Sequence, residues 1–239
     1  MNVQLFIPCF VDQLYPQTAF NMIKVLEKAG CTVTYNDQQT CCGQPAFNAG
    51  FRPQAKDVCT KFIKDFAGTD YIVAPSASCV GFVRNYYTTL FGDSSMLKNV
   101  KALQTRAFEF SEFLVNVLHI EDFGASLNAK ATYHDSCAGL RECHIKSEPR
   151  RLLAKVRGLE LVEMNDVETC CGFGGTFAVK FEPISISMAD QKVTNASLTN
   201  ADYIISTDIS CLMHIEGFAK HKGLPIRTMH LADVLAQGW

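Results

Sequence analysis

The sequence predicts an α/β protein of two pseudo-symmetric, Rossmann-like halves, each a short parallel sheet flanked by helices. The first observation is a doublet that occurs twice, as Cys41-Cys42-Gly43 and as Cys170-Cys171-Gly172. The second is that strand-like and helix-like segments alternate around each doublet, which is typical of a parallel sheet with helices on its faces. The third is that the order of these segments recurs in the second half, as expected for two copies of one structural unit.

The first half begins with residues 3–8, a short apolar run that predicts a buried strand. Residues 17–29 carry an apolar stripe with helical spacing and are followed by a glycine, which predicts a helix. Residues 32–35 are β-branched and aromatic and predict a second strand before the doublet. Residues 53–66 predict a helix with proline near its start, and residues 70–74 predict a third strand.

The second half repeats this order around the second doublet. Its predicted segments are a strand at 131–134, a helix at 148–156, a strand at 159–162, a helix at 184–198 and a strand at 201–205. The last of these closely resembles the third strand of the first half in sequence. The repeat therefore predicts an internal pseudo-two-fold axis.

Each half also ends in a similar segment, residues 106–114 in the first and residues 227–235 in the second. The sequence therefore predicts a division into residues 1–122 and residues 129–239, packed together as one unit. The stretch between them contains Gly124-Ala125-Ser126, which is typical of a connector.

Composition and charge limit the classes of function. A chain of 239 residues with 48% hydrophobic and 19% charged residues suits a compact protein with a sizeable core. Its net charge of −2 gives no electrostatic basis for binding nucleic acid or an anionic membrane. The N-terminal residues lack the basic start of a signal peptide, and no stretch reaches the roughly 18 apolar residues of a transmembrane helix. We therefore expect a cytoplasmic protein, in which thiols stay reduced.

Eight of the 11 cysteines form two sets of four with one pattern, in which a single cysteine precedes each doublet and another follows it. The single cysteines follow predicted strands, and ligands in a parallel α/β unit gather beyond the carboxyl ends of strands. Two adjacent cysteines can bind one centre only if the backbone turns, which the glycine after each doublet permits. The sequence therefore predicts two soft-metal sites near the pseudo-two-fold axis. The candidate ligands are Cys9, Cys41, Cys42, Cys79, Cys137, Cys170, Cys171 and Cys211.

Four thiolates suit either an iron–sulfur cluster or a zinc ion. Structural zinc sites usually use pairs of cysteines separated by two to four residues, and neither half has such a pair. The spacing therefore favours iron–sulfur clusters, and zinc in one or both sites stays open as the alternative.

The other cysteines and the histidines have mostly structural interpretations. Cys31 begins a strand and Cys59 lies in a helix, so both are expected to pack in the core. Cys143 is an alternative extra ligand, because it follows the first cysteine of the second set closely. His134 and His144 flank that set, but histidines in such places are more often hydrogen-bonded structural groups than ligands.

Four stretches resemble the cysteine-rich CCG domain, which occurs twice in one of the subunits of heterodisulfide reductase and in related iron–sulfur oxidoreductase subunits. They are residues 7–12 (IPCFVD), 40–46 (TCCGQPA), 133–137 (YHDSC) and 170–177 (CCGFGGTF). The resemblance covers essentially the whole chain. It extends to the lactate-utilisation protein A group, also described as glycolate oxidase iron–sulfur subunits.

The chain departs from the heterodisulfide reductase pattern, which supplies five thiolates per half and holds a non-cubane cluster. Ser76 and Asp208 stand where that pattern has its fifth cysteine. The resemblance therefore implies one ordinary four-iron (4Fe-4S) cluster per half, held by the eight cysteines named above.

The resemblance further implies an oxidoreductase subunit that acts within a complex. Its role would be iron–sulfur electron transfer in a multi-protein system that oxidises lactate or a related 2-hydroxy acid. The implied partners are a ferredoxin-like iron–sulfur subunit and a third subunit. Two alternatives stay open, a thiol–disulfide redox enzyme and a zinc-stabilised assembly module without redox activity. The missing fifth cysteines argue against the first. The sequence identifies no catalytic residue.

Overall fold

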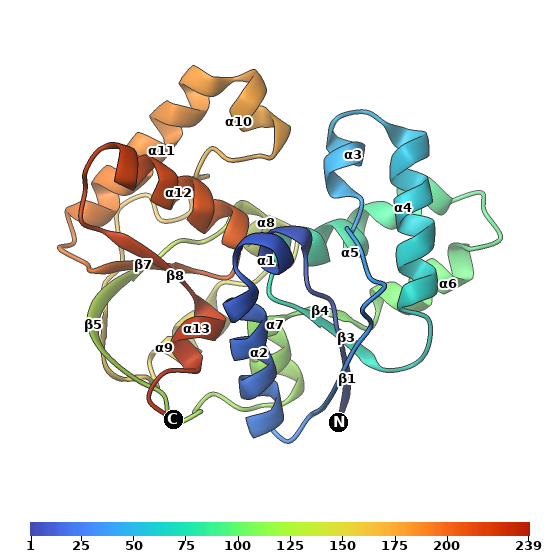
Figure 1. The fold of residues 1–239 in the computed structure, drawn as a ribbon, viewed down its shortest axis with the longest axis horizontal. Helices are drawn as coiled ribbons and strands as arrows, with labels where there is room; N and C mark the ends of the chain where they lie inside the picture. The colour runs from blue at the N-terminus through green and yellow to red at the C-terminus, as the bar shows by residue number, and fades with distance from the viewer.

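The chain forms two four-stranded parallel sheets that lie side by side (Figure 1). The computed structural model describes residues 1–239. The strand orders are β2-β1-β3-β4 and β6-β5-β7-β8, so both halves arrange their strands in the same way, and every pair is parallel. The predicted α/β class with two Rossmann-like halves is confirmed. The strands are β1 (Asn2–Leu5), β2 (Thr32–Tyr35), β3 (Tyr71–Ala74), β4 (Ala107–Glu109), β5 (Ser126–Tyr133), β6 (Arg157–Leu161), β7 (Tyr203–Ser206) and β8 (Arg227–His230).

Four of the helices lie where the sequence predicts helices. Three of them, α2, α4 and α11, have a proline at one of their first two positions, where its missing N–H costs no hydrogen bond. The four are α2 (Pro16–Lys28), α4 (Arg52–Asp65), α9 (Ser147–Leu153) and α11 (Glu182–Ser197). The other helices are α1 (Cys9–Leu14), α3 (Gln44–Asn48), α5 (Ala77–Phe91), α6 (Leu97–Gln104), α7 (Phe110–Glu112), the π-helix η1 (Phe113–Val117), α8 (Cys137–Arg141), α10 (Thr176–Lys180), α12 (Ile209–His221) and α13 (Leu231–Leu235). None of the helices is both long and apolar enough to cross a membrane.

The two halves share a buried core. A cluster of 36 buried residues includes side chains from both sheets and from the helices near the centre of Figure 1, among them α2 and α13. A second cluster of 19 residues lies mainly between β3 and the helices α4, α5 and α6. Because apolar side chains of both halves fill one core, the relative position of the two sheets is fixed by packing.

The structure differs from the sequence prediction at three places. β1 ends at Leu5, short of the predicted end at residue 8, because the amide of Ile7 donates to the side chain of Gln39 instead of a neighbouring strand and Pro8 has no backbone N–H. β5 begins at Ser126, inside the predicted connector, because it pairs with the start of β6 there. The long helices α5 and α12, which follow the third strand of each half, were not predicted from the sequence.

The ends of the two halves match as the sequence predicts. β4 and α7 occupy the same place in the first half as β8 and α13 in the second. The last residue of the strand caps the following helix in both cases. Glu109 accepts hydrogen bonds from the amides of Ser111 and Glu112, and His230 accepts one from the amide of Ala232 through Nδ1.

Candidate metal centres

The four single cysteines lie where strands give way to helices. Cys9 is the first residue of α1, and Cys137 is the first residue of α8. Cys79 and Cys211 lie in the first turns of α5 and α12, directly after β3 and β7. Because β1, β3, β5 and β7 are the central strands of the sheets, all four thiols are placed at the carboxyl ends of their sheets, as the sequence predicts.

The doublets lie in the loops before α3 and α10, and a glycine turns the backbone after each of them. Gly43 has a φ of 93° and Gly172 a φ of 92°, both in the left-handed region that favours glycine. The amide of each glycine donates a hydrogen bond of 3.4 Å to the sulfur of the first cysteine of its doublet, Cys41 or Cys170. The turn therefore gives this sulfur a backbone partner in both halves.

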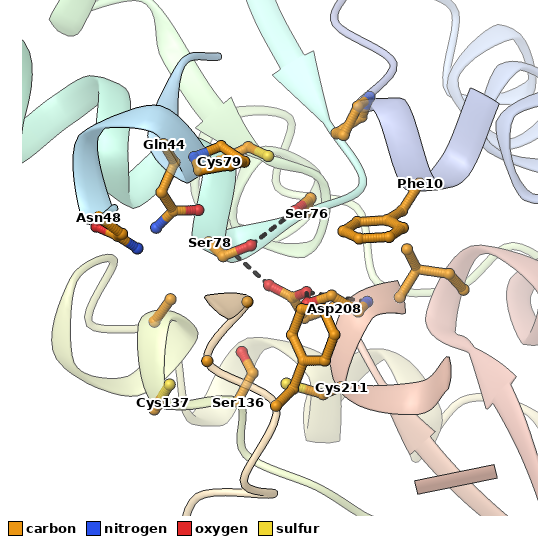
Figure 2. A pocket seen from close by; sticks show the side chains of 18 of the residues that line it. Phe10, Gln44, Asn48, Ser76, Ser78, Cys79, Ser136, Cys137, Asp208 and Cys211 are labelled. Atoms are coloured by element: carbon orange, nitrogen blue, oxygen red, sulfur yellow. Dashed lines mark hydrogen bonds between the residues drawn. The ribbon is translucent and has the colours of Figure 1, made fainter. Parts of the chain in front are cut away.

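Both sets of four cysteines open onto one pocket with a volume of about 230 Å³, part of which is seen in Figure 2. The pocket is lined by residues of both halves, and its lining includes every one of the eight cysteines singled out in the sequence: Cys9, Cys41, Cys42, Cys79, Cys137, Cys170, Cys171 and Cys211. Each half therefore presents four soft thiol donors in one place. This donor set suits a four-iron cluster or a zinc ion.

The thiols within each set affect one another's protonation. Hydrogen bonds from the thiols of Cys42 and Cys9 hold the pKa of Cys41 well below its usual range, and the pKa of Cys170 is lowered by its neighbours in the same way. The hydrogen bond with Cys41, together with burial, raises the pKa of Cys42. Metals bind thiolates, so the thiols whose pKa is raised would release their protons when a metal binds.

The two halves meet at the base of this pocket. Ser76 and Asp208 form an isolated antiparallel bridge, and the Asp208 carboxylate accepts a hydrogen bond of 2.8 Å from the amide of Ser78 (Figure 2). The rings of Phe10 and Phe173, one from each half, meet edge to face with 5.7 Å between their centroids. The two residues that replace a fifth cysteine therefore connect the halves.

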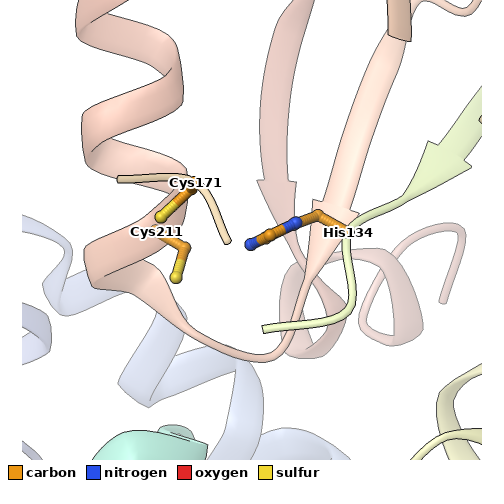
Figure 3. Close-up of side chains that lie close together, drawn as sticks. All are labelled: His134, Cys171 and Cys211. Carbon is orange, nitrogen blue, oxygen red and sulfur yellow. The ribbon is translucent and has the colours of Figure 1, made fainter. Parts of the chain in front are cut away.

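His134 is the residue of this region whose surroundings the sequence does not predict. It follows β5, and its ring nitrogen and the sulfurs of Cys171 and Cys211 lie within 4.8 Å of one another (Figure 3). The interpretation as a hydrogen-bonded structural group is wrong, because neither ring nitrogen has a hydrogen-bond partner. Burial, with a smaller contribution from the charge of Lys192, lowers the pKa of His134 to about 3, so the ring is neutral.

The three remaining cysteines do not line the pocket. Cys31 and Cys59 are buried in the core, as predicted. Cys143, the alternative extra ligand, is also buried, and its thiol donates a hydrogen bond of 3.4 Å to the carbonyl oxygen of Ala77. The structure therefore does not bring Cys143 to the candidate centre of the second half.

The family of the chain follows from comparison with known proteins. Residues 3–84 and residues 131–216 each match the CCG family, which is described as "Cysteine-rich domain". The chain belongs to the CCG cysteine-rich domain family. The two matches contain the two cysteine sets, and the family membership confirms the resemblance found in the sequence.

Several curated proteins are similar to this chain over nearly its whole length. "Lactate utilization protein A" of Halalkalibacterium halodurans is 46% identical over 98% of this chain and 96% of its own length. "Lactate utilization protein A" of Geobacillus kaustophilus is 43% identical over 98% of both chains. "Lactate utilization protein A 2" of Bacillus cereus strain 03BB102 is 41% identical over 100% of this chain and 99% of its own length.

A solved structure shares the fold described above. The crystal structure of a hypothetical protein from Helicobacter pylori superposes with a TM-score of 0.62 at 12% identity. The match covers 100% of this chain and 49% of that protein. At this low identity, the similarity concerns the fold alone.

Proposed function

We propose that this chain is an iron–sulfur electron-transfer subunit of a multi-protein system that oxidises lactate or a related 2-hydroxy acid. One four-iron cluster would be held by each half. The ligands would be Cys9, Cys41, Cys42 and Cys79 in the first half, and Cys137, Cys170, Cys171 and Cys211 in the second. The observation that carries this proposal is the single pocket onto which all eight thiols open.

The chemistry of the substrate class supports two centres. Oxidation of lactate to pyruvate releases two electrons and two protons, and a bound four-iron cluster supplies one-electron transfer. Two clusters that face one pocket, each transferring one electron, match the two electrons released. The names of the similar proteins, lactate utilization protein A, support lactate as the substrate of the complete system.

Residues of this chain would tune each centre. The amides of Gly43 and Gly172 donate to the sulfurs of Cys41 and Cys170, and hydrogen bonds to ligand sulfur are one of the factors that set the reduction potential of a cluster. The apolar residues of the pocket lining, among them Phe10, would limit the access of water to the centres. Both effects act on the potential without a change of ligand.

The proposal includes partners and a compartment. A ferredoxin-like iron–sulfur subunit and a third subunit would complete the system, and the two-electron chemistry on lactate itself would take place in the assembled complex. We place the chain in the cytoplasm, because reduced thiols are available there for metals.

Metal analysis of protein purified without oxygen tests the proposal. We expect about eight irons and about eight sulfides per chain, as two four-iron clusters require, and an electron paramagnetic resonance signal after reduction. Cys170→Ser should remove about half of the iron. Cys31→Ser is the matched control, because its thiol lies outside the pocket, and it should leave the iron content unchanged.

Two results would refute the proposal. Zinc in both sites, with no iron in the anaerobic protein, would assign the thiols to a structural role. Equal iron loss in Cys170→Ser and Cys31→Ser would mean that iron does not bind at the pocket.

A further inference from the structure

We propose that His134 is a metal ligand of the second centre, together with Cys171 and Cys211, and that it takes the place of one of the other two cysteines of that half. This inference rests on the proposed function, because it concerns the ligands of one of its two centres. The imidazole nitrogen and the two sulfurs lie within 4.8 Å of one another, and the ring points from the end of β5 toward the sulfurs (Figure 3). Donors around a tetrahedral metal with bonds of ~2.0–2.3 Å lie ~3.4–3.8 Å apart. A small inward movement of the side chains is therefore enough to bind one zinc ion, whereas in a four-iron cluster each of the three donors would bind a different iron.

His134 has no other partner for its ring. The residue is 0% exposed, and both ring nitrogens lack a hydrogen bond. Leaving a buried polar group unpaired is destabilising, so such groups are rare without a specific reason. His230, which is also buried, lacks a partner only at Nε2, because its Nδ1 accepts a hydrogen bond of 3.1 Å from the amide of Ala232. A metal bond would satisfy one nitrogen of His134.

The first half has no such donor, although its backbone is equivalent. The amide of Phe6 donates to the carbonyl oxygen of Val73 at 3.0 Å, and the amide of His134 donates to that of Ile205 at 2.8 Å. These matching bonds place Phe6 and His134 at the same position of the two halves. The Phe6 ring packs edge-on against Phe62, with 4.8 Å between centroids.

The same replacement of an aromatic by a polar side chain occurs on the neighbouring helix. A Cβ on Gly43 would meet Ala55 and Val58 of α4, and a Cβ on Gly172 would meet Ser185 and Met188 of α11. With α4 and α11 aligned in this way, Phe62 of the first half corresponds to Lys192 of the second.

Lys192 does not compete with the metal for His134. Its ammonium group donates to the carbonyl oxygens of Asp166 and Val167 at 2.8 and 3.0 Å. The polar surroundings of His134 are therefore specific to the second half. The two centres would differ in ligand type and hence in reduction potential.

Electron–nuclear double resonance on the reconstituted full chain tests this ligand directly. The chain is labelled with a nitrogen isotope in histidine, loaded anaerobically with iron and sulfide, and reduced. We expect the strong coupling of a directly bound nitrogen. His134→Phe, which installs the residue of the first half, should abolish this coupling. His134→Gln should abolish it as well, and circular dichroism identifies which of the two variants is folded.

His214→Phe is the matched control. His214 lies on α12 in the same half, but its Nε2 is 3.2 Å from the hydroxyl of Ser185, and it is not part of the histidine–cysteine cluster. The nitrogen coupling should persist in this variant. A coupling lost in the His134 variants and kept in His214→Phe supports the assignment.

Failure of this inference can be distinguished from failure of the proposed function. Full iron content without a strong nitrogen coupling, or a coupling that survives the His134 substitutions, overturns the ligand and leaves the electron-transfer role in place. If the chain takes up no iron, the electron-transfer role is overturned. Zinc binding then tests whether His134 is a ligand. X-ray absorption of the zinc-loaded chain should show nitrogen at ~2.0–2.1 Å beside sulfur at ~2.3 Å. His134→Gln should remove the nitrogen and weaken zinc binding at this site at least ~10-fold. Sulfur alone in the unsubstituted chain overturns the assignment.

Discussion

The glycine after the second doublet is the position at which one added methyl group should have a large effect. Gly172 has a φ of +92°, and a Cβ there would lie 2.7 Å from the carbonyl oxygen of Ser185 and 2.9 Å from Cβ of Met188. The left-handed conformation costs ~1–2 kcal/mol for a residue with a side chain. Forcing a methyl group into a filled site costs a further ~1–3 kcal/mol. We therefore expect Gly172→Ala to lower the free energy of unfolding by ~2–5 kcal/mol.

Two other glycines calibrate this prediction. Gly50 has a φ of +90° with no atom within 4 Å of its added Cβ, so Gly50→Ala should cost only the ~1–2 kcal/mol of the conformation. Gly43→Ala should fall between the two, because its nearest atom at 2.8 Å is the sulfur of Cys59, a side chain that can move. Urea unfolding of the reduced, metal-free chain, followed by circular dichroism, gives all three values. Equal losses for Gly172→Ala and Gly50→Ala would refute the close approach of the second doublet to α11.

Three further predictions concern groups outside the doublets. Burial raises the pKa of Glu109 from 4.5 to about 8, so the folded chain keeps a proton that the unfolded chain loses between these values. The contribution of this group to stability should fall by ~1.4 kcal/mol per pH unit as the pH rises through that window. Glu109→Gln should flatten this slope in urea unfolding, and an unchanged slope would contradict the raised pKa. Asp135 is buried and accepts two hydrogen bonds of 2.9 Å from Arg150, so Arg150→Ala should lower the free energy of unfolding by ~3–5 kcal/mol. Asp135→Asn in the same chain should restore part of this stability. No restoration would mean that the loss comes from packing. The Tyr87 hydroxyl donates a hydrogen bond of 2.7 Å to the carbonyl oxygen of Cys42, so Tyr87→Phe should lower stability by ~1–3 kcal/mol in the same assay, and a smaller change would show that water replaces the donor.

The sequence predicts the central strands and the helices α2, α4, α9 and α11 because their patterns are local. The segments 71–74 and 203–206, for example, are short runs rich in apolar and β-branched residues, one in each half. The helices α5 and α12 lack such a local pattern. Residues 77–91 mix aromatic, β-branched and small side chains, and seven of them are buried, so they show no clean polar face. Only their packing between sheet and neighbouring helices decides that they are helical.

The sequence likewise predicts only part of the candidate site. The repeated spacing predicts that the eight cysteines come together, because equivalent strand ends lie at the same edge of each sheet. The spacing does not reveal the environment of His134, because the direction of one side chain after a strand depends on tertiary packing. A comparison of the two halves position by position could have drawn attention to it, since the aromatic Phe6 of one half corresponds to a histidine in the other. The division at residues 122–129 stays a prediction.

The bridge between Ser76 and Asp208 joins the halves at equivalent positions. A symmetric dimer of identical units would place each of these residues opposite its own copy, and two aspartates facing each other would repel. In one continuous chain the two positions vary independently, so a serine can oppose an aspartate and the amide of Ser78 can bond to its carboxylate. The same freedom allows a histidine, His134, at the position that Phe6 occupies in the first half. Because both copies lie in a single polypeptide, each half keeps the geometry that gathers the thiols, while the two sites can differ in their side chains.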